Sequence, residues 1–143
     1  MKNFNLKKLA LALVMTVASI SFASAAKTDS GQTMDNCVSS YISLVKNGNI
    51  SNFNKMFTDD VKFTISTNGK NITHNKAEEY YFVSKNKGVA QQCEVLSSVV
   101  MSTDSYTIVK VSQVYDSFTR ENYVTLIKTG SDWKINAVSS EFK

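Results

Sequence analysis

The sequence predicts an α+β domain in which helices precede an antiparallel sheet of about six strands. Three observations lead to this prediction. Apolar residues recur at helical spacing before Gly48, the period changes to two from Asp60 onward, and further apolar runs separated by turn residues follow Gly88. Short connections pair neighbouring strands antiparallel, so we expect the helices to cover one face of a single sheet.

The amino-terminal segment has the three-part layout of a secretory signal peptide. Lysines without any acid come first, an apolar run spans residues 9–20, and small residues occupy 23–25. The run is about a dozen residues long, whereas a membrane-crossing helix needs roughly 20. We therefore expect residues 1–25 to be removed during export. The remaining domain, residues 26–143, would then act in a bacterial periplasm or outside the cell.

Removal of this segment changes the charge of the protein. It takes three of the 16 basic residues and none of the 12 acidic ones, which leaves a formal charge of +1. The basic pI of the whole sequence, about 9.0, therefore comes largely from the removed segment. Scattered lysines are typical of a solvated surface, so we expect no nucleic-acid partner and no membrane attachment after cleavage.

Two cysteines, Cys37 and Cys93, leave two alternatives open. In an oxidising compartment the pair can form a disulfide bridge. Each can instead be a small buried apolar side chain. The sequence does not give the Cα separation that a bridge requires.

Two helices are predicted first. The apolar stripe of the first comprises Met34, Cys37, Val38, Tyr41 and Val45. Gly48 suits the left-handed position that closes a helix. A second, short helix is indicated over residues 50–57, with Asn49 or Ser51 as its cap.

A β-hairpin is predicted next. Apolar and polar residues alternate from 61 to 66, and Asn68 and Gly69 supply the positive φ angles of a type I′ turn. Counting outward from this turn pairs Phe63 with His74. The histidine, which is the only one in the sequence, therefore shares a face with apolar side chains.

A third helix and the remaining strands complete the chain. Asn75 and Glu78 form a capping-box pattern, and the helix is expected to stop at Gly88. The acidic pairs at 59–60 and 78–79 fall at an expected turn and an expected helix start, where turn and helix-dipole roles are usual. Strands are predicted over Cys93–Met101, Tyr106–Tyr115, Tyr123–Lys128 and about Trp133–Val138.

Several of these strands are apolar on both faces. Ile108 stands beside Val109, and Leu126 beside Ile127. Helices cover one face of the sheet, and an apolar patch on the other face is typical of an interface. We therefore expect a homodimer that forms through the outer sheet face.

The chain resembles the nuclear transport factor two-like superfamily, in particular its SnoaL-like and lumazine-binding-like domains, over nearly all of residues 26–143. The motifs that carry the resemblance are Asn47-Gly48-Asn49, Phe53-x-x-Met56-Phe57, Thr58-Asp59-Asp60-Val61-x-Phe63 and Gly130-Ser131-Asp132-Trp133-Lys134-Ile135. The resemblance implies a cystatin-like cone, in which a strongly curved sheet is closed by three helices around a pocket, and an often dimeric protein. Members include isomerases, cyclases, dehydratases and proteins without catalysis. Ketosteroid isomerase-like relatives carry an acidic base near the end of the first strand, and the stretch 63–66 here has no carboxylate.

Few catalytic chemistries fit the residues that are present. With one histidine and no Gly-x-Ser-x-Gly element, nothing indicates a nucleophile. The cysteines and the histidine lack the spacing of zinc ligands, and no glycine-rich loop is available for phosphate. We therefore predict no metal and no cofactor.

His74 leaves two alternatives open, a structural role and a weak candidacy as a catalytic base. The candidate pocket residues are Tyr41, Phe63, Ile65, His74, Tyr81, Gln113, Tyr115 and Tyr123, and Tyr80 is a further aromatic candidate. Three functions follow as hypotheses. They are a non-catalytic domain that binds a small, partly apolar molecule, an isomerase- or dehydratase-type enzyme with His74 as base, and a dimeric scaffold with a plugged interior.

Overall fold

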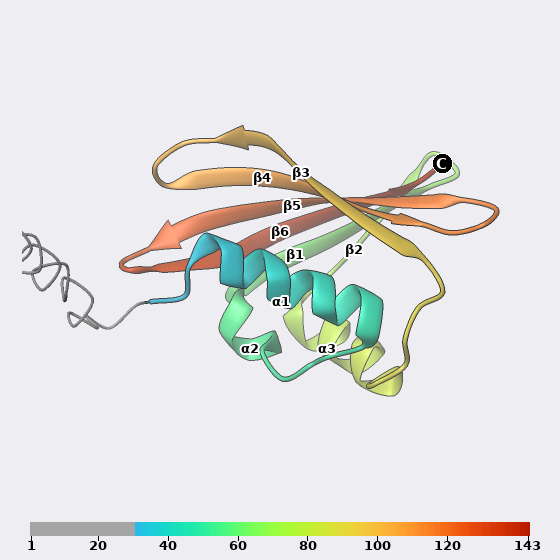
Figure 1. Ribbon diagram of the computed structural model, residues 1–143, viewed down its shortest axis with the longest axis horizontal. Helices are drawn as coiled ribbons and strands as arrows, with labels where there is room; N and C mark the ends of the chain where they lie inside the picture. Colours follow the sequence, from blue (N-terminus) through green and yellow to red (C-terminus); the bar gives the residue numbers. More distant parts are fainter. Residues whose placement is uncertain (1–30) are drawn as a thin grey trace, which may run out of the picture. The chain divides into compact units, whose positions relative to one another are not determined.

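The computed structural model of the protein describes residues 31–143, so the expected signal peptide and its cleavage site lie outside the described residues. The elements are α1 (Met34–Asn47), α2 (Phe53–Met56), β1 (Phe57–Thr67), β2 (Lys70–His74), α3 (Lys76–Lys85), β3 (Glu94–Ser102), β4 (Tyr106–Val114), β5 (Thr119–Thr129) and β6 (Asp132–Phe142) (Figure 1). The predicted α+β class and the six strands are confirmed. None of the helices described has the length and hydropathy of a membrane-spanning segment.

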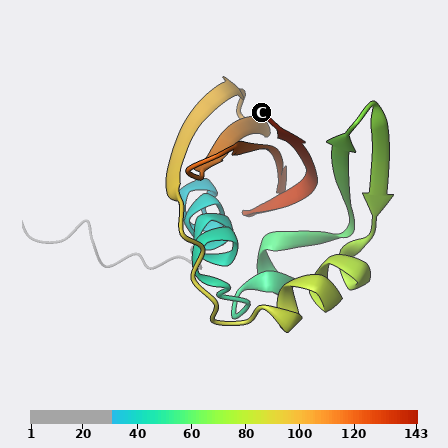
Figure 2. The same ribbon diagram turned by 90° about the vertical axis from the view of Figure 1, so that its right-hand side faces the viewer.

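The six strands form one curved, unclosed sheet in the order β2-β1-β6-β5-β4-β3. Figure 2 shows the sheet bending from β3 round to the hairpin of β1 and β2, with the helices gathered along one side. Four of the neighbouring pairs are antiparallel, and β1 lies parallel to β6. The sequence predicted antiparallel pairing alone, because it showed only connections between consecutive strands. The parallel pair joins the first strand of the sheet to the last.

The predicted hairpin has the expected register. Asn68 and Gly69 have φ angles of 49° and 72°, as a type I′ turn requires. Phe63 lies opposite His74. This pairing brings the imidazole over the Phe63 ring, with the ring centroids 5.4 Å apart and the planes 12° from parallel.

Several element ends differ from the prediction. Asn52, rather than Asn49 or Ser51, precedes α2, and its side chain makes no capping hydrogen bond. Asn49 accepts from the amide of Ser51 at 3.1 Å. The capping box of Asn75 and Glu78 is confirmed, and α3 ends at Lys85 with Asn86 as its cap, before Gly88. Asp59 and Asp60 lie within β1 rather than at a turn, where the register of β1 against β6 shifts.

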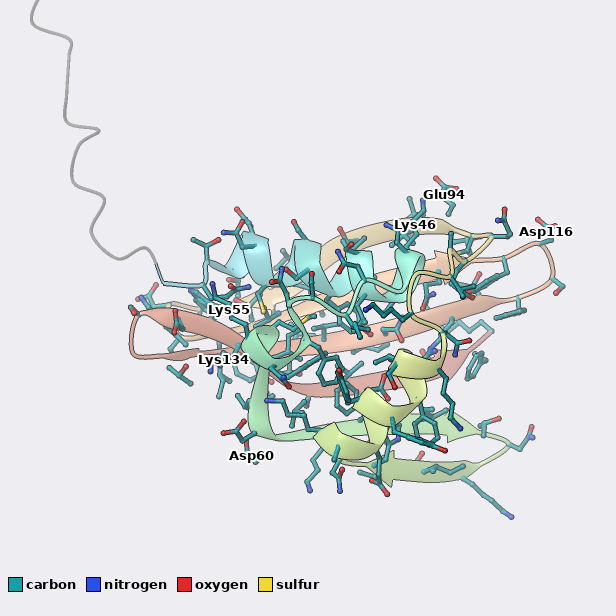
Figure 3. The ribbon with its side chains drawn as sticks, turned by 90° about the horizontal axis from the view of Figure 1, so that it is seen from below. Lys46, Lys55, Asp60, Glu94, Asp116 and Lys134 are labelled. Atoms are coloured by element: carbon teal, nitrogen blue, oxygen red, sulfur yellow. The ribbon has the colours of Figure 1, made fainter. Side chains whose placement is uncertain are left out.

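The hydrophobic core lies between the sheet and the first two helices. Its largest fully buried side chains include Phe53, Met56, Phe57, Leu126 and Ile135. The helix α1 packs on β6 and β4, α2 packs on β1 and β6, and α3 packs on β1. We call the side of the sheet that faces the helices its inner face. Figure 3 shows labelled acidic side chains such as Asp60 and Glu94 projecting away from this core.

Both cysteines are free thiols in the structure, so the disulfide that the sequence left open is not formed in it. Cys37 is buried in the first turn of α1, and its Sγ donates to the carbonyl of Met56 at 3.5 Å. Cys93 is half-buried, directly precedes β3 and lies near Tyr115. The two thiols contact different parts of the chain.

Candidate ligand pocket

A cavity of about 500 Å³ opens between α1, α3, the hairpin of β1 and β2, and the ends of β4, β5 and β6. Its apolar wall includes Leu44, Phe63, Ile65, Val83 and Val89. Its polar wall includes His74, Glu79, Gln91, Gln113, Tyr115 and Arg120. Ligand pockets of this size are typically apolar with a few polar groups that orient the ligand.

Six of the eight predicted pocket residues line this cavity. They are Tyr41, Phe63, Ile65, His74, Gln113 and Tyr115. They come from α1, both strands of the hairpin, β4 and the turn that follows it. The fold therefore brings together side chains that are up to 74 positions apart in sequence.

Tyr81 and Tyr123 do not line the cavity. The Tyr81 ring is 56% exposed on α3, and the Lys85 ammonium lies 4.0 Å from its centroid. Tyr123 lies on the outer face, because side chains alternate along a strand and its neighbours Asn122 and Val124 are fully buried on the inner face. Tyr80, the further aromatic candidate, packs against Phe53 with 5.2 Å between the ring centroids.

One side of the cavity carries a histidine and a carboxylate in direct contact. Nε2 of His74 is hydrogen-bonded to Oε2 of Glu79, and both side chains are mostly buried. Phe63 stacks on the imidazole and Phe82 meets it edge-on. The sequence indicated only a helix-dipole role for Glu79, in the first turn of α3. The capping box places that first turn beside the end of β2. A carboxylate five residues after a histidine at a strand end was the pattern in the sequence that could have identified this contact.

The opposite side of the cavity carries a chain of amide and hydroxyl hydrogen bonds. Gln113 donates from Nε2 to the Tyr115 hydroxyl at 3.1 Å, and this hydroxyl donates to Gln91 at 3.2 Å. Asn122 donates to Oε1 of Gln113 at 3.2 Å. Ser140 donates to Oδ1 of Asn122 at 2.7 Å. These buried polar groups hold one another in place and fix the wall.

Arg120 stands at the end of this chain and was missed by the sequence reasoning. Its Nη2 donates to Oγ of Ser140 at 3.3 Å, and its Nε is buried without a hydrogen-bond partner among the residues described. The side chain has the same strand parity as Asn122 and Val124, which are fully buried. A cation on the inward parity of a strand was the signal that could have identified it.

Tyr41 lies within reach of both sides of the cavity. Burial raises the pKa of its hydroxyl well above the usual range, the Arg120 charge lowers that pKa, and the Glu79 charge raises it. No hydrogen bond of the Tyr41 hydroxyl is found within residues 31–143. The cavity therefore offers a neutral phenol whose hydroxyl is available to a ligand.

The geometry permits binding of a small molecule and, at His74, proton transfer. An imidazole oriented by a carboxylate is a recurring arrangement for a general base. In the part of the chain that the structure describes, no three His, Cys, Asp or Glu side chains gather as metal ligands do.

Solved structures similar to this one share its fold. A protein of unknown function from Silicibacter pomeroyi, described as NTF-2 like, is 8% identical with a TM-score of 0.62, over 76% of this chain and 92% of that chain. A Cytophaga hutchinsonii NTF2-like protein is 19% identical with a TM-score of 0.57, over 74% and 92%. A Rhodospirillum rubrum NTF2-like protein described as "of unknown function in nutrient uptake" is 15% identical with a TM-score of 0.59, over 77% and 98%.

The sequence comparisons divide in two. A search of curated proteins finds no match. The family described as "Putative lumazine-binding" matches residues 29–140, which include all the helices, the strands β1 to β5 and most of β6. The chain therefore belongs to this family, and its fold is that of the NTF2-like structures.

Proposed function

We propose that this protein is an exported, non-catalytic domain that binds a small, partly apolar molecule. The cavity of about 500 Å³ is the observation that carries the proposal. The scaffold hypothesis predicts an interior filled by side chains, whereas this protein has an open cavity with His74 on its wall. The apolar wall would take up the body of the ligand, and the polar groups would set its orientation.

A panel of metabolites tests this proposal by thermal shift and by amide chemical shifts. The panel includes lumazine, because the family description names it. We expect at least one compound to raise the melting temperature and to shift resonances of pocket residues. Val83→Trp, which fills the cavity from α3, should abolish the effect. Tyr81→Trp adds the same ring on the same helix outside the cavity and should leave binding intact. The absence of any binding compound would contradict the proposal.

A second candidate function is an isomerase- or dehydratase-type enzyme. The contact between His74 and Glu79 on the cavity wall favours it, because the carboxylate orients the imidazole. With Nε2 held by Glu79, Nδ1 would be the atom that takes the substrate proton. His74→Ala should abolish turnover of any substrate found, and turnover that survives this change would exclude the mechanism.

We also propose that the protein is a homodimer. Leu96 and Met101 on the outer side of β3 are each about half exposed, and Met101 is paired with Ile108 of β4. Light scattering at micromolar concentration tests this, and a monomer would contradict it.

Export is tested by amino-terminal sequencing of the protein recovered from the periplasm or the medium, where we expect Ala26 as the first residue.

A further inference from the structure

We infer that the pocket selects an organic anion, an apolar molecule that carries one carboxylate, and that Arg120 is the residue that binds this carboxylate. The inference rests on the proposed binding function and adds the chemical class of the ligand. It follows from the charges around the cavity, from the free donor atoms and from the apolar wall.

Arg120 has no carboxylate partner within the described part of the chain. Glu121 shares the outward strand parity of Tyr123 and pairs with Lys143 at 2.7 Å, and Glu141 pairs with the same lysine at 3.3 Å. Glu79, the acid on the cavity wall, contacts His74. Mostly buried guanidinium groups are usually paired with an anion. Here the acids nearby are engaged elsewhere, and the guanidinium faces the cavity.

The free donors of Arg120 suit a carboxylate. Nη2 makes a single long hydrogen bond of 3.3 Å to Ser140, and no hydrogen bond of Nη1 is found among the described residues. A guanidinium binds a carboxylate through two parallel hydrogen bonds, and its two Nη atoms form such a fork. The Tyr41 hydroxyl, which Arg120 influences electrostatically, could donate to one carboxylate oxygen.

Phosphate is disfavoured by the donors around the cavity. At the start of α3, the capping box engages the backbone amides of Asn75 and Glu78. The ammonium of Lys76 is directed away from the cavity wall toward Asp59 and the carbonyl of Phe57, at 3.0 and 3.2 Å. The Arg120 guanidinium is thus the cationic group on the cavity wall, and its single positive charge complements a ligand with a single negative charge.

The remaining wall suits an apolar body rather than a sugar. Phe63, Ile65, Val83 and Val89 contribute side chains to it, and they come from the hairpin, from α3 and from the loop after α3. The ligand would place its carboxylate at Arg120 and its apolar part against these residues. Burial of apolar surface supplies affinity, and the charged contact supplies selectivity.

A matched pair of probes tests the inference. Naphthalene-1-acetate carries a carboxylate, and naphthalene-1-acetamide has the same ring and a neutral amide in its place. Both are titrated into the full mature chain with amide chemical shifts as the readout. The acetate should bind at least roughly tenfold more tightly, because charge-assisted hydrogen bonds are about twice as strong as neutral ones. The Nε–H signal of Arg120 should also shift with the acetate.

Three variants separate the charge of Arg120 from a structural role. Arg120→Gln should reduce the preference for the acetate to about onefold while amide binding persists. Arg120→Lys should retain part of the preference, because it keeps the charge and loses the fork. Lys128→Gln removes an exposed charge from the same strand and should change nothing.

The two proposals fail in different ways. Equal affinity for both probes in the parent protein, or an acetate preference that survives Arg120→Gln, would overturn the inference and leave the binding function standing. If neither probe shifted a pocket resonance and the metabolite panel also failed, the binding function and the inference would fall together.

Discussion

The two ends of the inner sheet face differ in how they are filled. At one end α1 and α2 insert Cys37, Phe53 and Met56, and the first residue of β1 adds Phe57, all nearly inaccessible to solvent. At the other end α3 contributes no buried residue, and its apolar side chains border the cavity. The same curved sheet therefore supports a packed core and an open pocket. The difference lies in the helices, because α2 carries two large, fully buried side chains, Phe53 and Met56, within one turn.

This contrast assigns stability to one end and recognition to the other. Close packing at the α2 end removes large side chains from water, which is the main favourable contribution to folding. At the α3 end less apolar surface is removed from water, and the space that remains is the cavity. Substitutions at the two ends should therefore have different consequences.

The largest expected effect is the loss of a ring from the packed end. Phe57→Ala should destabilise the protein by about 3–5 kcal/mol, because Phe57 is fully buried against other aromatic rings. Phe82→Ala removes the same ring from α3, where Phe82 is 51% exposed, and should cost less than about 1 kcal/mol. Urea unfolding of both variants measures the difference. Similar losses would show that the α3 end is packed as tightly as the α2 end.

An intermediate effect is expected at the junction of the two ends. Gly48 closes α1 at φ 63°, and an added Cβ would lie 2.5 Å from the carbonyl oxygen of Asn86. Gly48→Ala should therefore cost more than the roughly 1–2 kcal/mol that a left-handed alanine alone requires. Gly69→Ala at φ 72° has nothing within 4 Å of the new Cβ and isolates this conformational cost. Equal unfolding free energies for the two variants would exclude a close contact between α1 and the loop after α3.

The smallest effect concerns the two thiols, whose rates of chemical modification compare a closely packed position with a more accessible one. Burial raises the pKa of the Cys37 thiol to about 11, and the thiolate is the reactive form. At pH 8 iodoacetamide should modify half-buried Cys93 well before Cys37. Equal rates would contradict the buried position of Cys37, and no reaction of either without reductant would reveal a bridge.

The same pKa shift has a consequence for stability. Because the folded-state pKa of Cys37 is raised above the ordinary 9.0, the unfolded chain loses this proton first. The contribution of the neutral thiol is complete below pH 9 and declines as the pH rises toward 11. Cys37→Ala should flatten this part of the pH profile, as measured by urea unfolding.

The sequence predicted the elements well wherever the signal was local. The turn at Asn68 and Gly69, the capping box at Asn75 and the register of Phe63 against His74 all depend on residues a few positions apart. The parallel pairing of β1 with β6 depends on strands at opposite ends of the domain, and no local pattern encodes it.

The pocket was predicted in part for the same reason. Apolar and aromatic wall residues follow from strand parity, whereas Tyr123 was assigned to the pocket by its type although its parity is outward. Arg120 was missed because an isolated arginine resembles a surface charge in sequence. Only the fold reveals that its neighbours in space are Ser140 and the cavity.

The position of β1 beside β6 also determines when the molecule can finish folding. The hairpin of β1 and β2 has β6 as its other neighbour in the sheet, and β6 is the last element of the chain. A polypeptide that is still emerging from a ribosome therefore lacks the strand that borders this hairpin and one wall of the cavity. The cavity is therefore complete only once β6, which contributes Val138 and Ser140 to its lining, has paired with β1.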